Sequence, residues 1–163
     1  MDASSAIILY KAGLHSLLAR TYNIVLPTSV YIEITAKPYA GSREYEQLAE
    51  GNKIGVQENT DSQKITGMER LDTGEYDAIQ LFYNGVGSFI ITDDGPAARY
   101  CKKAGVPFIN ALLFPVILRF AQIKDDDFCV EAMERIIENG RYSYDIISFA
   151  KKCSQESITF AIP

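Results

Sequence analysis

The sequence has 163 residues, of which 47% are hydrophobic and 23% charged, and its formal net charge is −5. This composition is typical of a soluble globular chain forming one domain over residues 1–163, and the acidic balance argues against a general attraction to nucleic acid. The single histidine and three separated cysteines exclude multi-histidine sites, zinc patterns and a disulfide framework, so we expect free thiols in a reducing cytoplasm.

Helix and strand signals alternate along the chain, which predicts an α/β fold with a mostly parallel sheet covered on both faces by helices. Thr28 and Thr73 are the expected N-caps of two of the helices. The longest apolar run, 111–118, is too short to span a bilayer, so no membrane partner is expected. The predicted strands are 22–27, 53–58, 88–92 and 106–110. The predicted helices are 4–20 (jointed at Gly13), 28–36, 42–52, 73–85 and 95–104, followed by a helical tail from about 111 over 111–122, 126–138 and 143–153.

Two adjacent carboxylates follow the strand in "SFIITDDGPAARYCKKAG". Asp93 and Asp94 stand at the carboxyl end of that strand, where open α/β sheets bind their ligands, and each raises the cost of ionising the other. A helix cap followed by Pro96 explains one of these carboxylates but not both.

Three other acids stand beside apolar positions. Glu75 precedes the apolar stripe of helix 73–85, although a first-turn acid also suits the helix dipole. Glu33 lies in an otherwise apolar helix, and its alternative is a surface pair with Lys37. Asp2 precedes the first helix, where capping alone would explain it. The run of Asp residues at 125–127 has no apolar neighbours and indicates a solvated cap.

The acids together predict a site for a hard divalent cation. Carboxylates at the starts of helices and loops, without histidine, suit Mg²⁺ or Mn²⁺, which take oxygen ligands and leave room for a phosphate. Such a site activates water and stabilises the charge that develops during phosphodiester cleavage.

Four segments resemble the acidic motifs of the PIN domain family, in the order "MDASSAI", "VLPTSVYIEI", "LDTGEYDAIQL" and "IITDDGPAARYCKKAGV". The "GEYDAI" form and the helical tail are similar to a prokaryotic subgroup of toxin ribonucleases of the VapC type. The resemblance covers nearly the whole chain and implies a three-layer α/β/α fold, with a mostly parallel sheet, flanking helices and a helical C-terminal tail.

The resemblance also implies a metal-dependent ribonuclease acting on single-stranded RNA, often as the toxin of a toxin–antitoxin pair. An antitoxin protein and a second copy of the chain are implied partners, and the apolar helices 7–18 and 111–120 are the expected dimer interface. The implied catalytic residues are Asp2, Glu33, Glu75 and Asp94. The implied metal ligands are Asp2, Glu75, Asp93 and Asp94, with Ser4 and Thr92 orienting the carboxylates.

The sequence departs from the family pattern at its first motif. Family members place a hydrophobic central strand before the first Asp, whereas only Met1 precedes Asp2 here, so either the start lies upstream or this strand is truncated. In the second case, Asp2 is expected on a mobile end. The truncation favours an alternative function, a catalytically silent PIN-like module that binds a partner protein. A receiver-like phosphoacceptor domain is a third hypothesis, but no lysine at the end of a late strand supports it.

Three basic residues follow the paired carboxylates on helix 95–104. Arg99, Lys102 and Lys103 are candidates for contacts with the RNA backbone, and a solvated helical face is their alternative.

Overall fold

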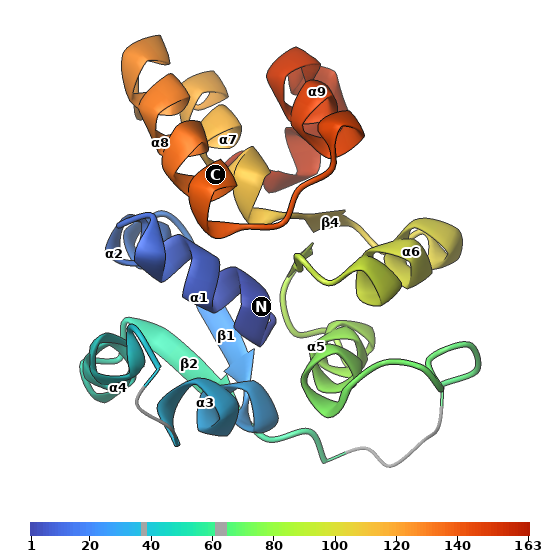
Figure 1. Ribbon diagram of the computed structural model, residues 1–163. Coiled ribbons are helices and arrows are strands. Elements are labelled where there is room, and N and C mark those ends of the chain that lie inside the picture. The colour runs from blue at the N-terminus through green and yellow to red at the C-terminus, as the bar shows by residue number, and fades with distance from the viewer. Residues whose placement is uncertain (37–38, 61–64) are drawn as a thin grey trace.

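The computed structural model describes residues 1–36, 39–60 and 65–163, and its elements follow the predicted alternation (Figure 1). The predicted loop over 59–70 therefore lies partly outside the described residues. The strands are β1 (Ile24–Pro27), β2 (Ile54–Gln57), β3 (Ile90–Ile91) and β4 (Phe108–Ile109). The helices are α1 (Ala3–Lys11), α2 (His15–Thr21), α3 (Thr28–Thr35), α4 (Ser42–Glu50), α5 (Thr73–Tyr83), α6 (Gly95–Ala104), α7 (Phe114–Phe120), α8 (Asp126–Asn139) and α9 (Tyr144–Lys152), with 3-10 helices η1 (Ala111–Leu113) and η2 (Gln155–Ala161).

The ends of several helices follow from local chemistry. The first predicted helix divides at Gly13, whose φ of 74° is readily adopted only by glycine. Two expected caps were wrong. Pro27 ends β1 directly at α3, so Thr28 is already the first helical residue. Asp72 caps α5 in place of Thr73, because Asp72 and Glu75 form a reciprocal capping box.

The strands form two separate parallel pairs, β1 with β2 and β3 with β4. The first two residues of the chain lie between the two pairs. The amine of Met1 donates to the carbonyl of Val25 on β1 at 3.2 Å, and the amide of Asp2 donates to the carbonyl of Ile91 on β3 at 3.1 Å. Met1 and Asp2 therefore join the two half-sheets at the position of a central strand.

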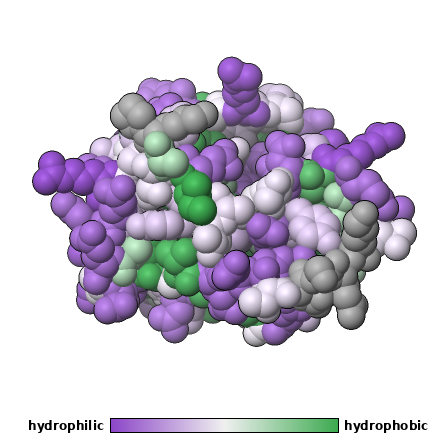
Figure 2. Space-filling view, turned by 90° about the horizontal axis from the view of Figure 1, so that it is seen from below, coloured by the Kyte–Doolittle hydropathy of each residue, from purple (hydrophilic) through white to green (hydrophobic). Residues whose placement is uncertain are grey.

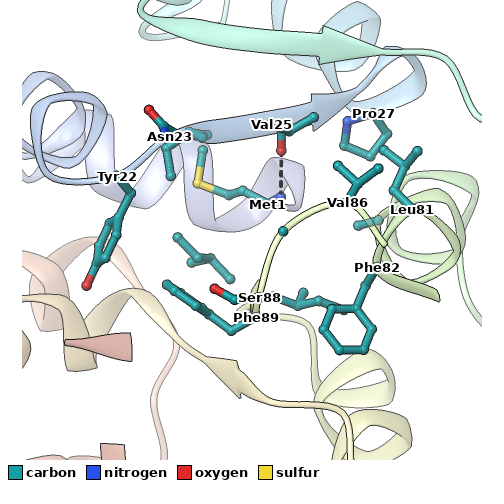
Figure 3. A pocket seen from close by; sticks show the side chains of 15 residues that line it. Met1, Tyr22, Asn23, Val25, Pro27, Leu81, Phe82, Val86, Ser88 and Phe89 are labelled. Atoms are coloured by element: carbon teal, nitrogen blue, oxygen red, sulfur yellow. Dashed lines mark hydrogen bonds between the residues drawn. The ribbon is translucent and has the colours of Figure 1, made fainter. Parts of the chain in front are cut away.

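A groove runs beside Met1 between β1 and the segment leading to β3 (Figure 3). Its volume is about 300 Å³, and much of its lining is apolar. In Figure 3, Tyr22 and Val25 approach it from the β1 side and Phe82 and Phe89 from the other side. Burial lowers the pKa of the Met1 ammonium to about 6, against the opposing effect of Asp2. Burial thus disfavours the charged form of the amine, at a place suited to a neutral backbone amide.

The helices cover the half-sheets with two hydrophobic clusters. The larger cluster joins α1, β1, α3 and the C-terminal helices, which gather at the top of Figure 1. The smaller cluster, which includes Ile79, Ile90 and Cys101, packs α5 and α6 against β3. Residues 111–118 are all buried, so the expectation that 111–120 forms a dimer interface was wrong: this apolar helix serves the core. All three cysteines are buried free thiols.

Across the described part of the chain, no helix combines the length and apolarity needed to cross a membrane.

The groove generates a prediction about stability. We expect an apolar extension of about five residues, such as alternating Val and Thr fused before Met1, to raise the melting temperature by about 3 °C or more. The extension replaces the buried terminal amine with an amide and pairs with β1 and β3. Thermal melting monitored by circular dichroism measures this change. A Gly/Ser extension of equal length is the matched control, and equal melting temperatures for the two extensions would contradict this interpretation of the groove.

Candidate active site

Asp2 is a buried carboxylate at the junction of the half-sheets, with 2% of its surface exposed. Its Oδ1 accepts from the amide of Ser5 at 2.7 Å, which is the helix cap expected for this position. Its Oδ2 accepts from the Thr92 hydroxyl at 2.5 Å and the Asp93 amide at 3.1 Å. Capping therefore accounts for only one oxygen, and Asp2 is fixed by β3 rather than lying on a mobile end.

Asp93 and Asp94 have different roles. Asp94 caps α6, with Oδ1 accepting from the Ala97 amide at 2.7 Å. The Asp93 carboxylate accepts from the Ser5 hydroxyl of α1 at 2.7 Å. From the C-terminal part of the chain it accepts from the Tyr142 hydroxyl at 2.5 Å and the Ala111 amide at 3.0 Å. Burial raises the pKa of Asp93, and the Tyr142 and Ser5 hydrogen bonds oppose this rise. Asp93 thus works as a structural anchor beside the site.

The pKa of the Glu75 carboxyl is shifted both by burial and by neighbouring charges. Burial raises the pKa of Glu75 to about 7, and the negative charges of Asp94, Asp72 and Asp2 add to the rise. The Asp72 amide, which donates to Oε2 at 2.7 Å, opposes it. The influence of both Asp94 and Asp2 indicates that the three carboxylates share one electrostatic environment.

Glu33 reaches the same neighbourhood from α3. A Cβ added at Gly74, at the start of α5, would lie 3.0 Å from Val30 Cγ2, so the close approach of α3 and α5 favours glycine there. The same Cβ would lie 3.6 Å from Glu33 Oε2, which places the Glu33 carboxylate beside the start of α5. The side chain of Glu33 is exposed. Its alternative pairing with Lys37 falls outside the described residues.

Two polar contacts correct the sequence analysis. The contacts expected from Ser4 come from Ser5, because the third helical residue faces back toward the cap whereas Ser4 is exposed. Asp77 on α5, which the sequence alone would place in solvent on the side of the helix opposite Glu75, accepts from the Ser29 hydroxyl at 2.5 Å and from Asn59 at 3.2 Å. The Ser29 bond ties α3 to α5. The sequence carried no signal for Tyr142, which reaches Asp93 from 49 positions away.

The donor set fits a hard divalent cation. Asp2, Glu75 and Asp94 offer only oxygen, as Mg²⁺ and Mn²⁺ require. Burial is the main cause of the raised pKa of Glu75, and a cation would relieve the part of the rise that comes from neighbouring negative charges. Among the described residues, no three acidic, histidine or cysteine side chains already converge on one point. Glu75 is folded back onto Asp72. Rotation of the Glu75 side chain away from the Asp72 amide would free its carboxylate to bind a ligand.

A family model described as DUF3368, a PIN domain, matches residues 1–152. The chain belongs to the PIN domain family. PIN domains are generally nucleases and typically use divalent metal ions. No curated protein and no solved structure matches the chain significantly. The helical content and short parallel sheets of this PIN domain agree with the expected α/β/α fold and helical C-terminus.

The Asp93 anchor in this PIN domain can be tested by removing one hydroxyl. We expect Tyr142→Phe to lower the free energy of unfolding by about 1 to 2 kcal/mol, because a half-buried carboxylate loses a hydrogen bond while the ring is kept. The melting temperature should fall by about 2 to 8 °C. Tyr144→Phe, at a side chain that is 82% exposed, is the matched control. Equal melting of both variants and the parent would show that the Asp93–Tyr142 bond adds no stability.

The raised pKa of Glu75 predicts how stability depends on pH without metal. The folded chain holds this proton more tightly than the unfolded chain, whose value is about 4.5, so stability should fall as the pH rises from about 4.5 to about 7. Glu75→Gln keeps the capping box and removes this dependence. We expect the variant to gain about 1 kcal/mol over the parent between pH 4.5 and 8, a figure reduced for solvent screening.

Melting temperatures of the two proteins at both pH values provide the measurement. Glu50→Gln, at an exposed position on α4, is the control and should show no such gain. A constant difference between Glu75→Gln and the parent at both pH values would contradict the shared environment of the carboxylates.

Proposed function

We propose that this PIN domain is a Mg²⁺- or Mn²⁺-dependent endoribonuclease that hydrolyses phosphodiester bonds of single-stranded RNA. The observation that carries the proposal is that Asp2 and Asp94 meet at the end of β3, where Asp2 Oδ2 accepts from the amides of Asp93 and Asp94 at 3.1 and 3.4 Å. Burial raises the pKa of the nearby Glu75, and the charges of Asp94, Asp72 and Asp2 add to the rise. A cluster of carboxylates that repel one another at the ends of parallel strands is costly unless a cation offsets the repulsion.

The site residues have separate roles in the proposed reaction: some would bind the cation and others orient the ligands. Asp2, Glu75 and Asp94 would hold the cation, and Glu33 would hold a second one. The bound cation supplies positive charge to the scissile phosphate and lowers the pKa of the attacking water. Thr92 and Ser5 fix the orientation of Asp2, which can therefore present its carboxylate without loss of side-chain freedom.

Partners belong to the same proposal. An antitoxin protein and a second copy of the chain would be the expected partners of a toxin ribonuclease. We place their contact on α8 and α9, where Val130 and Phe149 are exposed to 57% and 54%. A groove of about 420 Å³ lies between these helices, with Met133 and Ile137 among its apolar lining residues.

A second candidate function is a catalytically silent module that acts by binding a protein. It is favoured by the absence of three converging ligand side chains among the described residues. The exposed side chains of α8 and α9 would serve this function equally well. Metal binding separates the two candidates, because a silent module has no need of a cation.

The test combines metal binding with cleavage of single-stranded RNA. Mn²⁺ at about 100 times its Kd should stabilise the parent by about 2.7 kcal/mol, and EDTA should reverse the effect. Asp94→Asn and Glu75→Gln should lose most of this stabilisation and reduce cleavage by roughly 100-fold or more, because a neutral amide is a poorer ligand for a hard cation.

Asp125→Asn is the matched control, since Asp125 caps α8 through the Phe128 amide at 2.9 Å as Asp94 caps α6. Asn caps nearly as well as Asp, so all these proteins should fold. Full cleavage by either site variant would remove that residue from the proposed mechanism. A parent that neither binds Mn²⁺ nor cleaves RNA would favour the silent module.

A further inference from the structure

A second concavity lies between residues 66–71 and α6. Its volume is about 400 Å³, and its lining includes Arg70, Arg99, Lys103 and Tyr100. None of the catalytic or metal-binding residues predicted from the sequence lines it. Seen from below, the visible face carries mostly hydrophilic side chains, with hydrophobic ones in small areas (Figure 2). The lining of the concavity combines three cations and one aromatic ring with the smaller apolar contributions of Leu71, Pro96 and Ala104.

The three cations of the concavity form no ion pair with the described acidic residues. Within residues 1–36, 39–60 and 65–163, no carboxylate lies within 4 Å of the charged groups of Arg70, Arg99 or Lys103, and the ion pairs that do occur involve Arg119 and Arg135. The nearby carboxylate of Glu69 accepts instead from the Gly67 amide at 3.0 Å, the bond that most lowers its pKa. Arg70 also lowers the pKa of Glu69 through its charge, without an ion pair. Three cations in one concavity of a chain with net charge −5 favour an anionic ligand.

Tyr100 adds an aromatic wall. It is half-buried, and its hydroxyl lies 3.2 Å from that of Tyr83. Gly67, at a φ of 91°, passes close to the ring, and a Cβ there would lie 3.5 Å from Tyr100 Cε2. The lack of a side chain at Gly67 thus leaves room beside the ring. Aromatic rings next to cations are the combination that binds single-stranded nucleic acid, with phosphates on the cations and bases on the rings.

Arg99 connects the concavity to the carboxylates. A Cβ added at Gly95 would lie 3.2 Å from Arg99 Nη1, so the guanidinium folds back over the first residue of α6. Gly95 directly follows Asp94, whose carboxylate caps α6 through the Ala97 amide. The Arg99 guanidinium and the Asp94 carboxylate therefore lie at the same end of α6, next to each other along one path for an RNA strand.

We propose that this concavity binds one nucleotide of single-stranded RNA next to the cleaved bond, with the phosphate held by Arg70, Arg99 and Lys103 and the base against Tyr100. The proposal rests on the proposed ribonuclease function. It adds Arg70 and Tyr100 to the basic residues expected from the sequence and leaves out Lys102, which is exposed on α6 but does not line the concavity.

Binding of fluorescein-labelled hexauridylate to the full chain in EDTA tests the proposal without cleavage. Arg99→Gln and Lys103→Gln should each weaken binding by roughly 5-fold or more and reduce the slope of log K against log salt by about 0.7, the value for one lost phosphate contact. Lys102→Gln is the matched control on the same helix and should leave this slope unchanged. Tyr100→Leu should weaken binding by roughly 5-fold or more, whereas Tyr100→Phe keeps the ring and should bind like the parent.

The outcomes separate the subsite from the ribonuclease activity. Equal effects of Lys102→Gln and Arg99→Gln would overturn the subsite, since binding would then depend on general charge. Competition by hexaglutamate as strong as by unlabelled hexauridylate would also overturn it in favour of an acidic peptide. If the pocket variants bind poorly but the parent fails to cleave RNA with Mn²⁺, the subsite stands and the hydrolase proposal fails. If they cleave normally at low substrate concentration, the subsite fails and the hydrolase proposal stands.

Discussion

The structure depends on the position of one buried carboxylate. Asp2 caps α1 with one oxygen and accepts from Thr92 and the Asp93 amide with the other, while its own amide donates to β3. Met1 completes the connection by donating to β1. Two residues thereby hold together two half-sheets that share no strand-to-strand hydrogen bonds in the described part of the chain. The same contacts that complete the fold also fix the first carboxylate of the site.

The carboxylates are arranged so that structural and chemical roles coexist. Asp94 and Asp2 each use one oxygen for a helix cap, and Glu75 uses one in a capping box. These hydrogen bonds stabilise the charged forms and offset part of the cost of grouping like charges. Burial raises the pKa of Glu75, and the remaining repulsion adds to the rise. Asp93 is held apart from this group by Tyr142 and Ser5, which explains how two adjacent acids occupy one strand end.

Local signals predicted the helices well, and tertiary contacts decided what the sequence could not show. The limits of α6 were predicted correctly because Asp94, Pro96 and Gly105 mark its ends. The acids could be grouped by their positions before helices and after a strand. The different roles of Asp93 and Asp94 could not be predicted from the sequence, because they depend on a hydrogen bond from Tyr142, which is 49 positions away from Asp93. The split sheet was also unexpected, since β3 and β4 pair over only two residues each.

The central claim is that Asp2, Glu75 and Asp94 share one cation. Paramagnetic broadening of backbone amide signals by substoichiometric Mn²⁺ tests it most directly, because broadening falls steeply with distance from the ion. The account predicts that the amides of residues 2, 75 and 94 broaden first, while those of the solvated acids at 125–127 remain sharp. Broadening centred on residues 125–127, or spread evenly over exposed acids, would contradict the claim.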